Sequence, residues 1–374
     1  MKVTFGALLL CCISIEAREL AVVELSGAPY ERGLKHGLAL KTQIGKSIAI
    51  WKKALQDQTR RDPEGLIAEF LRDRDFMAAT RHWTPEIIDE VHGIADGASQ
   101  PFDTMWAMQL IDEMWVFIDE QRSIAHCSSA GVPGRASNPA YVAQNLDIDW
   151  FYDGFQTVLH MKEEQGLPEQ LIFTTVGVVA LNGMNNRSIA VAVNTLSELR
   201  ASRDGLPVAF VIRGILSKQN ASEALNFLKS VPHASGQNYI VGAGDRVYDF
   251  EASAAKVVQY APNGEQGTVY HTNEALVNDD RKHLPGNRSD TNSRSRLEAL
   301  RKRLTNDDAG ADEIASALRS RDSEEHPVCR RMVQGKVFTF GSTIMTLSKH
   351  PWLQVSMGPP DTNPYCRFEF SIVH

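Results

Sequence analysis

The chain has little cysteine and lacks the cysteine and histidine spacings that usually hold a metal. Only five cysteines occur in 374 residues, and no Cys-x-x-Cys or His-x-x-x-His pair is present. Structural zinc sites normally use four cysteine or histidine ligands at short spacings. We therefore expect no metal and no cofactor. The five cysteines are Cys11, Cys12, Cys127, Cys329 and Cys366.

An excess of positive charge is also missing. The chain carries 39 Lys and Arg against 46 Asp and Glu, for a net charge of -7 and a pI near 5.9. A general nucleic-acid binder needs a basic face to neutralise phosphates, so we expect no nucleic-acid partner. Basic residues are locally dense from Arg294 to Arg303. Because acidic residues interleave with them, this stretch is typical of a solvated helix face.

Long apolar runs are absent, and the one notable run stands at the start. Val3 to Ile15 is apolar, follows Lys2, and precedes a small residue at Ala17. The run is shorter than the roughly 20 residues that span a bilayer. We expect a signal peptide over residues 1–17, a secreted or periplasmic protein, and no stable membrane insertion. The alternative is a buried first strand in a cytoplasmic protein.

Two common enzyme signatures are missing as well. No Gly-x-Ser-x-Gly occurs, which argues against a serine nucleophile on a strand-to-helix elbow. Gly242-Ala243-Gly244 follows a predicted strand but lacks the rest of a dinucleotide-binding pattern. The length of 374 residues allows one large domain or two ordinary ones.

The secondary structure predicted from the pattern changes at Cys127. Before it, apolar residues recur at helical spacing, and Thr84-Pro85 suggests an N-cap followed by a first helical residue. After it, short β-branched segments separated by turns alternate with a few helices, which indicates sheets covered by helices. The expected helices are Glu31–Leu55, Pro63–Ala79, Thr84–Ile94, Thr104–Phe117, Leu206–Leu216, Ala221–Leu228 and Arg294–Leu304. The expected strands are Tyr141–Gln144, Thr157–Met161, Gln170–Val176, Ile189–Val193, Tyr239–Val241, Val337–Leu347, Trp352–Met357 and Arg367–Val373.

Cys127 is the most informative residue. If the leader is removed, three cysteines remain, and an odd number in an exported protein flags a free reactive thiol. An extended segment that ends in Asn145-Leu146-Asp147 follows about twenty residues later. This arrangement suggests that the chain cuts itself before Cys127. The freed α-amino group, with a pKa near 8, could then accept the thiol proton. The alternative is a buried structural cysteine.

Further motifs follow one another in an order that resembles a known family. They are Leu25–Gly33 with His36-Gly37, Glu90–Gly97, Glu113, Cys127–Ser129, Gln144–Asp147, Gly183–Asn185, Asn194–Leu196, Ser235–Tyr239, Glu251, His271–Asn273 and Val328–Arg330. Over about residues 23 to 358 this set resembles the penicillin acyltransferase-like branch of the N-terminal-nucleophile (Ntn) hydrolases. That branch includes the Tan-type β-alanyl amine hydrolases.

The resemblance implies a fold and a processing event. The fold would be α+β, a four-layer α-β-β-α sandwich. Cleavage between His126 and Cys127 would give an α chain of residues 18–126 and a β chain of residues 127–374, which stay packed as one domain. The sequence departs from the family at His126, because the residue before the nucleophile is usually small. A larger side chain there alters the strain at the scissile bond.

The resemblance also assigns the main catalytic roles. Cys127 would attack an amide carbonyl, Asp147 would hold the terminal amine or thiol in register, and Asn273 would donate to the oxyanion. Such donors are typically worth about 3 kcal/mol in acyl transfer. Asp147 could instead be a surface or turn residue, or could exchange roles with Asp149. Asn273 could simply be a turn asparagine.

Four residues would support the substrate or brace the site: Asn145, Asn185, Asn194 and Arg330. Asn185 and Asn194 could equally reflect turn chemistry, and Arg330 could form a surface pair with Arg331.

Two histidines fit a catalytic role less well. Successive side chains of an extended segment point to opposite faces, so His126 is a poor base for Cys127. His271 is more typical of a core histidine with its ring nitrogens satisfied.

The predicted function is amide hydrolysis through an acyl-cysteine. The substrate would be a small molecule: an N-acyl amino acid, a β-alanyl amine, a lactam-derived amide or a lipid amide. Acyl-CoA donors should be scarce outside the cytosol, which favours water as the acceptor. The alternatives are acyl-CoA-dependent or amide-exchanging N-acyl transfer and, in another class, an unprocessed non-catalytic binding protein on the same fold.

Overall fold

The computed structural model describes residues 20–118, 127–164, 166–264, 266–282, 290–305 and 308–371. The predicted signal peptide and His126 lie outside these residues. The helices are α1 (Pro29–Ala39), α2 (Lys41–Thr59), α3 (Pro63–Asp73), α4 (Phe76–Trp83), α5 (Glu86–Ala98), α6 (Phe102–Met108), α7 (Ile111–Ile118), α8 (Val208–Leu216), α9 (Ala221–Ser230), α10 (Thr291–Arg303) and α11 (Ala311–Leu318). The strands are β1 (Ala21–Leu25), β2 (Ser128–Val132), β3 (Ala140–Asp149), β4 (Gln156–Met161), β5 (Gln170–Thr175), β6 (Asn182–Asn185), β7 (Ile189–Thr195), β8 (Gln237–Ala243), β9 (Arg246–Ala252), β10 (Val257–Tyr260), β11 (Val269–His271), β12 (Val337–Leu347), β13 (Trp352–Ser356) and β14 (Tyr365–Glu369).

Two sheets form the centre of the molecule. One has eight strands in the order β1-β4-β5-β6-β7-β8-β9-β10, and the other has six in the order β11-β2-β3-β12-β13-β14. The inner faces meet where β2 and β3 pack on β7, β8 and β9. Helix α8 packs on β6 and β7 with α9 beside it, while α10 and α11 cover β2, β3, β11 and β12. The predicted α-β-β-α sandwich is therefore confirmed.

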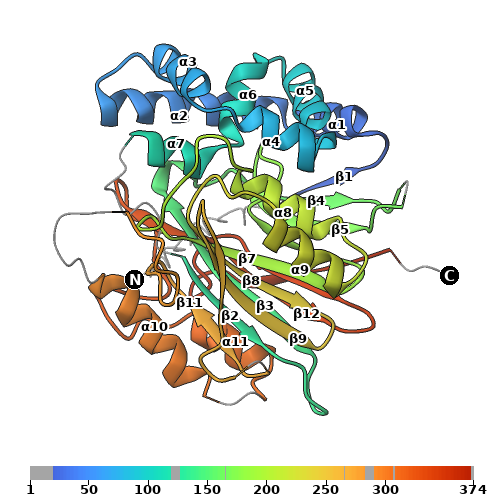
Figure 1. Cartoon of the computed structure of the whole chain (residues 1–374), viewed down its shortest axis with the longest axis vertical. Helices are drawn as coiled ribbons and strands as arrows, with labels where there is room; N and C mark the ends of the chain where they lie inside the picture. The colour runs from blue at the N-terminus through green and yellow to red at the C-terminus, as the bar shows by residue number, and fades with distance from the viewer. Residues whose placement is uncertain are drawn as a thin grey trace, which may run out of the picture.

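Helices α1 to α7 form a separate group at one end of the sandwich (Figure 1). The segment that carries them is joined to the sheets by β1, which pairs in parallel with β4 from Ala21↔Thr157 to Leu25↔Met161. One continuous apolar core links this group to the sheets, and Trp51 and Phe70 belong to the same cluster as Phe173. No helix within the described residues is both long and apolar enough to cross a membrane.

Several elements differ from the sequence prediction. The predicted helix Glu31–Leu55 is two helices separated at Leu40. The sequence did not show this division because the apolar spacing continues from one helix into the next. Helix α5 begins at Glu86, and the predicted cap at Thr84 is wrong: its hydroxyl makes no capping bond to α5. The Thr84 N–H instead ends α4 by donating to the Thr80 carbonyl. The pattern also missed the strands β1, β2, β6, β9, β10 and β11 and the helix α11. At β6 the glycine and asparagines of Gly183–Asn186 indicate a turn, but Asn182–Asn185 pairs with β5 and β7.

Glycine allows α1 and α5 to touch at the backbone. Gly33 and Gly37 on α1 face Gly93 and Gly97 on α5, and a Cβ at any of the four would overlap main-chain atoms of the opposite helix. For Gly93 the overlapped atom is the Tyr30 carbonyl oxygen. This close approach brings Glu90 of α5 against Arg32 of α1.

Glu90 links the helical group to the sandwich. Its two carboxylate oxygens accept from both terminal nitrogens of Arg213 on α8, at 2.7 and 2.9 Å, and from Arg32 at 3.1 Å. All three side chains are buried. Burial alone would raise the pKa of Glu90, but Arg213 and then Arg32 outweigh it and lower this pKa to about 2. Removing either partner of such a buried pair leaves a bare charge, which typically costs about 3–5 kcal/mol.

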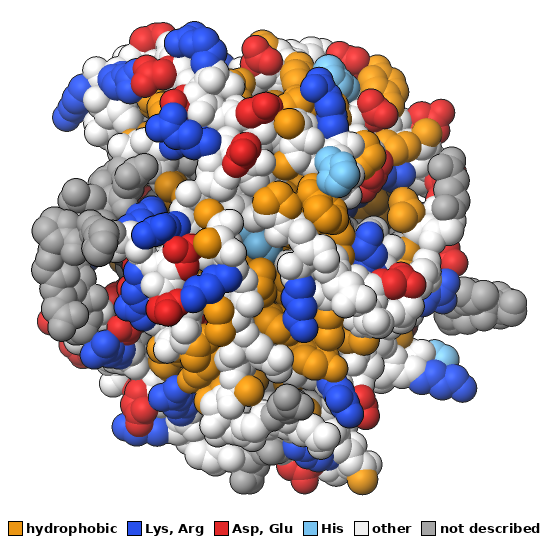
Figure 2. Space-filling view, viewed as in Figure 1, with side chains coloured by type: hydrophobic (Ala, Val, Ile, Leu, Met, Phe, Trp, Pro, Cys, Tyr) orange, Lys and Arg blue, Asp and Glu red, His pale blue; other side chains and the backbone are white. Residues whose placement is uncertain are grey.

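The visible surface carries charges of both signs. Lys and Arg side chains are interspersed with Asp and Glu over the face in Figure 2. This face therefore has no broad basic region of the kind that binds a phosphate backbone.

The glycine contact predicts a pair of opposite stability effects. Gly93→Ala should destabilise the fold by roughly 2 kcal/mol or more, because its methyl group meets fixed backbone. Gly45→Ala on α2 should be neutral or stabilising by up to about 1 kcal/mol, because its methyl group meets only Gln100 Nε2, at 3.9 Å. Urea unfolding of both variants measures this, and equal effects would contradict the predicted close contact.

Candidate active site

Cys127 stands directly before β2, at the rim of the sandwich that faces the helical group. The pairing of β2 with β3 sets its place, since Ser128 lies opposite Asn145. The thiol is 3% exposed, and its Sγ donates to the Asp147 backbone carbonyl at 3.8 Å. The structure thus brings together the two residues that the sequence placed twenty positions apart. The predicted cleavage between His126 and Cys127 stays a prediction, because His126 lies outside the described residues.

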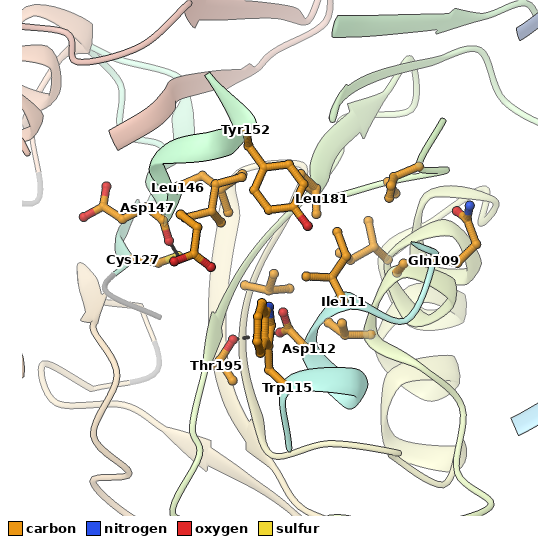
Figure 3. A pocket seen from close by; sticks show the side chains of 18 residues that line it. Gln109, Ile111, Asp112, Trp115, Cys127, Leu146, Asp147, Tyr152, Leu181 and Thr195 are labelled. Atoms are coloured by element: carbon orange, nitrogen blue, oxygen red, sulfur yellow. Dashed lines mark hydrogen bonds between the residues drawn. The ribbon is translucent and has the colours of Figure 1, made fainter. Parts of the chain in front are cut away.

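A small cavity opens beside Cys127. Its volume is about 60 Å³, room for a few water molecules or a short chain. The walls are largely apolar and come from α7, β3, β7 and α8, with Ile111, Trp115, Leu146, Val208 and Ile212 among them. Figure 3 shows Cys127 and Asp147 on one side, Asp112 and Trp115 on the other, and the Tyr152 hydroxyl pointing between them.

Asp147 is fully buried at an irregular point of β3. The β3–β12 register shifts between Thr339 and Gly341, directly opposite Asp147, and such bulges often re-aim side chains near active sites. Arg330 places Nε 3.2 Å from Asp147 Oδ2, a contact that the sequence did not predict. Burial raises the pKa of Asp147 to about 7, although Arg330 acts in the opposite direction. The carboxyl group is thus poised between its two protonation states near neutral pH.

Arg296 is a site residue that the sequence interpretation missed. Its guanidinium is fully buried and donates to the Cys127 carbonyl at 2.5 Å, to Ser128 Oγ at 2.9 Å and to Asn273 Oδ1 at 3.0 Å. The interpretation of Arg294–Arg303 as a solvated face is wrong at this position. Ser293, Leu297 and Leu300 are buried with it on one side of α10. These buried positions recur every three or four residues, and this spacing in the sequence could have indicated that Arg296 lies on the buried face of the helix.

Hydrogen bonds connect Asn273 and Asn194 to the segment that begins at Cys127. Asn273 accepts from Arg296 and donates through Nδ2 to the Thr195 carbonyl at 3.0 Å. Asn194 accepts from Ser129 Oγ at 2.6 Å. Because Arg296 occupies Oδ1 of Asn273, the amide NH₂ group is turned toward the side where Thr195 borders the cavity. Its oxyanion role stays a prediction.

A buried histidine and glutamate support the segment that carries Asn273. His271 bonds Glu251 Oε1 through Nε2 at 2.9 Å and the Thr272 carbonyl through Nδ1 at 2.8 Å. The Glu251 carboxylate also accepts from the backbone N–H groups of Val277 and Asn278. Both ring nitrogens of His271 are therefore engaged in holding this loop.

Asn145 and Asn185 are committed to the fold around the site. Asn145 Nδ2 donates to the carbonyls of Leu318 and Val328, at 2.8 and 2.9 Å. Asn185 donates to the carbonyls of Leu216 and Lys218 at the end of α8, and its Oδ1 accepts from the next turn of β6–β7. Neither amide group has a donor left for a substrate. Asn145 supports the segment before Arg330, whereas the structure does not bring Asn185 to the cavity.

Of two adjacent acids on α7, one lines the cavity and the other points away from it. Asp112 lines the cavity, and its Oδ2 accepts from Thr195 Oγ1 at 2.7 Å and Gln237 Nε2 at 2.8 Å. Glu113 points the other way and accepts from the Val208 N–H and Ser235 Oγ. Glu113 belongs to the ordered motifs of the sequence, but Asp112 was not recognised. An acid pair inside the apolar run Ile111–Ile118 was the signal.

Within the part of the chain that the structure describes, the Cys127 thiol makes no hydrogen bond to a side chain that could act as its base. Burial first and the negative Asp147 second raise its pKa to about 12. Its one hydrogen bond among the described residues goes to a carbonyl oxygen. At neutral pH it is therefore a protonated thiol and a weak nucleophile.

The other described cysteines form no disulfide. Cys329 and Cys366 are free thiols, one buried and one exposed, so the pairing that the sequence left open is not formed. Among the described residues no group of three His, Cys, Asp or Glu side chains is arranged to hold a metal ion.

A family model and a curated relative of similar length both match this chain, and both carry the same description. A model of the acyl-coenzyme A:6-aminopenicillanic acid acyl-transferase family matches residues 135–351, more than half of the chain. The 40 kDa form of acyl-coenzyme A:6-aminopenicillanic-acid-acyltransferase from Emericella nidulans is 26% identical over 333 residues, which cover 87% of this chain and 88% of that protein.

Solved structures give weaker likenesses. An N-acylethanolamine-hydrolyzing acid amidase ortholog from Caenorhabditis elegans is 18% identical, covers 59% of this chain and 92% of its own, and has a TM-score of 0.41. Penicillin V acylase from Agrobacterium tumefaciens is 14% identical, covers 65% and 86%, and has a TM-score of 0.43.

Arg296 should matter far more than its exposed neighbour on the same helix. Arg296→Met should lower the free energy of unfolding by roughly 3 kcal/mol, because it leaves buried acceptors at Cys127 and Asn273 unpaired. Arg294→Met is the control. Arg294 is 61% exposed and pairs with Glu274 at the surface, so its loss should cost less than about 1 kcal/mol. Chemical denaturation compares the two, and similar losses would contradict the buried clamp.

Glu113 predicts a pH-dependent stability difference. Burial, and then Asp112, raise the pKa of Glu113 to about 7, so the folded state holds its proton more tightly than the unfolded state. This contribution is complete below the unfolded pKa near 4.5 and is lost as pH rises through about 7. Glu113→Gln cannot lose a proton. Its stability relative to wild type should therefore rise by roughly 3 kcal/mol between pH 4 and pH 8. A pH-independent difference in urea midpoints would refute this shift.

Proposed function

The chain belongs to the acyl-coenzyme A:6-aminopenicillanic acid acyl-transferase family, and on that premise we propose that it hydrolyses small amides through an acyl-cysteine at Cys127. The nucleophile becomes active when the chain cuts itself between His126 and Cys127. The observation that carries the proposal is the buried thiol beside the cavity, whose one hydrogen bond to the described residues goes to a carbonyl oxygen and not to a base. Cleavage supplies that base on the same residue.

Self-cleavage would begin at the thiol. Cys127 Sγ attacks the His126 carbonyl carbon, the peptide C–N bond breaks as the Cys127 nitrogen takes a proton, and a thioester joins the two residues. The Cys127 nitrogen is now a free α-amino group, and water hydrolyses the thioester, which leaves a carboxylate on His126 and restores the thiol. Two features support this course: Arg296 holds the Cys127 carbonyl, and Asp147 lies against the residue.

The catalytic cycle uses the new amino group. Near its pKa of about 8 the amine accepts the thiol proton as Sγ attacks the substrate carbonyl. The resulting oxyanion is stabilised by amide N–H donors, with Asn273 the leading candidate. The amine returns the proton to the departing nitrogen, and water repeats the sequence on the acyl-cysteine. Asp147 holds the protonated amine, and its pairing with Arg330 keeps it in place.

Acyl transfer to an amine is the second candidate. It is favoured by the match to an acyltransferase family and by the fungal relative's name. The chemistry is shared up to the acyl-cysteine, and only the acceptor differs. Water is the preferred acceptor if residues 1–17 direct export, since acyl-CoA is scarce outside the cytosol. A non-catalytic binding protein is disfavoured by the family membership.

Processing predicts two polypeptides from one gene product. A denaturing gel of purified protein should show bands near one third and two thirds of the 41.5 kDa mass. N-terminal sequencing should find Cys127 at the start of the larger band and a residue near position 18 at the start of the smaller one. Cys127→Ala should give a single band without amide hydrolysis.

Asp147→Asn tests whether Asp147 holds the terminal amine. It should remain folded, because an amide keeps the shape of the carboxylate, but lose at least about 100-fold in kcat. Release of amine from a panel of N-acyl and β-alanyl compounds measures this. An active enzyme in which residue 127 is still bonded to residue 126 would end the proposal.

A further inference from the structure

Three deeply buried histidines differ in what their ring nitrogens face. His36 accepts the Gly177 N–H through Nε2 at 3.1 Å, so this nitrogen carries no proton. His233 faces the Leu228 carbonyl through Nε2 at 3.0 Å, and burial lowers its pKa to about 4. Both of these rings are therefore neutral near pH 7. His271 differs from them, because each of its nitrogens faces an oxygen that accepts a hydrogen bond.

The contacts of His271 require a proton on both ring nitrogens. Nδ1 lies 2.8 Å from the Thr272 carbonyl oxygen, which can only accept, and Nε2 lies 2.9 Å from Glu251 Oε1. The Glu251 carboxylate also accepts from the backbone N–H groups of residues 276–278, and such donors keep a carboxylate ionised. An ionised carboxylate has no proton to give, so Nε2 donates as well. The buried ring is then an imidazolium cation.

The titratable groups around the ring favour this cation. Burial alone would lower the pKa of His271, but Asp249 and Glu251 on β9 outweigh burial and raise this pKa. Burial raises the pKa of Asp249 itself to about 7, so its negative charge develops in the range where a histidine ordinarily loses its proton. Tyr260 on β10 lies edge-on to the ring, with 5.9 Å between ring centroids, and its hydroxyl accepts from Arg301 of α10 at 2.7 Å.

The second ring proton acts on the peptide group between Thr272 and Asn273. The Thr272 carbonyl accepts from His271 Nδ1, and the Asn273 N–H at the other end of this peptide donates to Ser293 Oγ at 2.9 Å. Both ends of the peptide plane are therefore fixed. A neutral ring has one N–H for two acceptors, so it would release either the Thr272 carbonyl or Glu251.

We propose that His271 is a buried cation that positions Asn273, the expected oxyanion donor. It is a positioning residue, because it holds the Thr272–Asn273 peptide and does not line the cavity beside Cys127. The proposal rests on the amide hydrolysis proposed above and adds a proton that the active enzyme must keep. Loss of this proton would let the peptide plane turn and would move the Asn273 amide relative to the thiol.

NMR of the ring nitrogens measures the protonation state without a substrate. The chemical shifts of the two nitrogens are alike in the cation and widely separated in a neutral ring. In wild-type protein labelled with nitrogen-15 at histidine, His271 should show two protonated nitrogens at about pH 7.5, whereas His36 and His233 should each show one. His271→Gln and His233→Gln assign two of these rings by the loss of their signals. A single protonated nitrogen on His271 at this pH would overturn the proposal.

The same two variants test the positioning role. His271→Gln should lower kcat at least about tenfold while KM changes less than about twofold, because the cavity that binds the substrate is intact. His233→Gln is the matched control, since it also replaces a buried ring that does not line the cavity. Its kcat should stay within about twofold of wild type. Rates are divided by the amount of processed chain, so that misfolding alone does not lower them. Equal losses of kcat in the two variants would contradict the role of His271.

Asp249→Asn tests the same role with the ring left in place, should His271→Gln not fold. The amide mimics the neutral carboxyl group, so the variant lacks only the charge that develops near pH 7. His271 should then lose its second proton at least about half a pH unit below wild type, and kcat should fall over the same interval. Asp245→Asn, at an exposed acid in the turn between β8 and β9, should change neither. A constant kcat while the ring loses its proton would refute the positioning role.

The two kinds of measurement separate this inference from the function on which it rests. A doubly protonated His271 in a processed protein that turns over no amide would support the buried cation and overturn the hydrolase proposal. A neutral His271 in an active hydrolase would overturn the inference and leave amide hydrolysis intact.

Discussion

A single buried guanidinium organises the surroundings of Cys127, the proposed nucleophile. Arg296 reaches from α10, which packs on β2 and β11, to the carbonyl of Cys127 and, with its other terminal nitrogen, to Asn273. Burial lowers its pKa to about 10, which still leaves it positive at neutral pH, and Asp147 provides the opposing charge. Because four acceptors, on Cys127, Ser128, Asn273 and Asn292, share one rigid planar cation, a shift in any of them displaces the others. The position of the thiol therefore depends on a helix more than 160 residues away in the sequence.

The acids around the cavity fall into two groups with different physical surroundings. Asp147 lies beside Cys127, close to two arginines, and its pKa near 7 reflects burial opposed by those cations. Asp112 lies across the cavity with the uncharged partners Thr195 and Gln237, and burial raises the pKa of Asp112 although both partners act in the opposite direction. The two acids therefore differ in their partners: cations surround Asp147, whereas hydroxyl and amide groups hold Asp112.

Much of the site could be predicted from local sequence because its chemistry is local. Cys127 and Asp147 sit on neighbouring strands, and a twenty-residue spacing is what one hairpin requires. Asn185 shows the limit of such reasoning. It belongs to an ordered motif, yet its amide group is fully used at the end of α8. A residue can belong to a family motif because it supports the fold or because it takes part in the chemistry. Only its contacts in the structure show which of the two applies.

Local sequence could not predict the burial of Arg296 or the division of the first helix at Leu40. A basic residue among basic neighbours looks solvated, and only the tertiary docking of α10 puts Arg296 inside. Likewise, Leu40 interrupts an apolar pattern that looks continuous, because both helices bury the same face. Short strands such as β11 are defined by their partners, so three residues carry too little pattern to predict them.

The parallel pairing of β1 with β4 has a consequence for what a cut at residue 126 would produce. The two pieces would share a β-sheet, with the backbone of one forming the border strand of the other. Separating the two pieces would leave backbone N–H and C=O groups of β4 unpaired along one edge of the sheet. Such an exposed edge can pair with strands of other molecules. Any attempt to rebuild the protein from its separated halves would thus compete with aggregation, whereas the linked precursor assembles the border strand within one molecule.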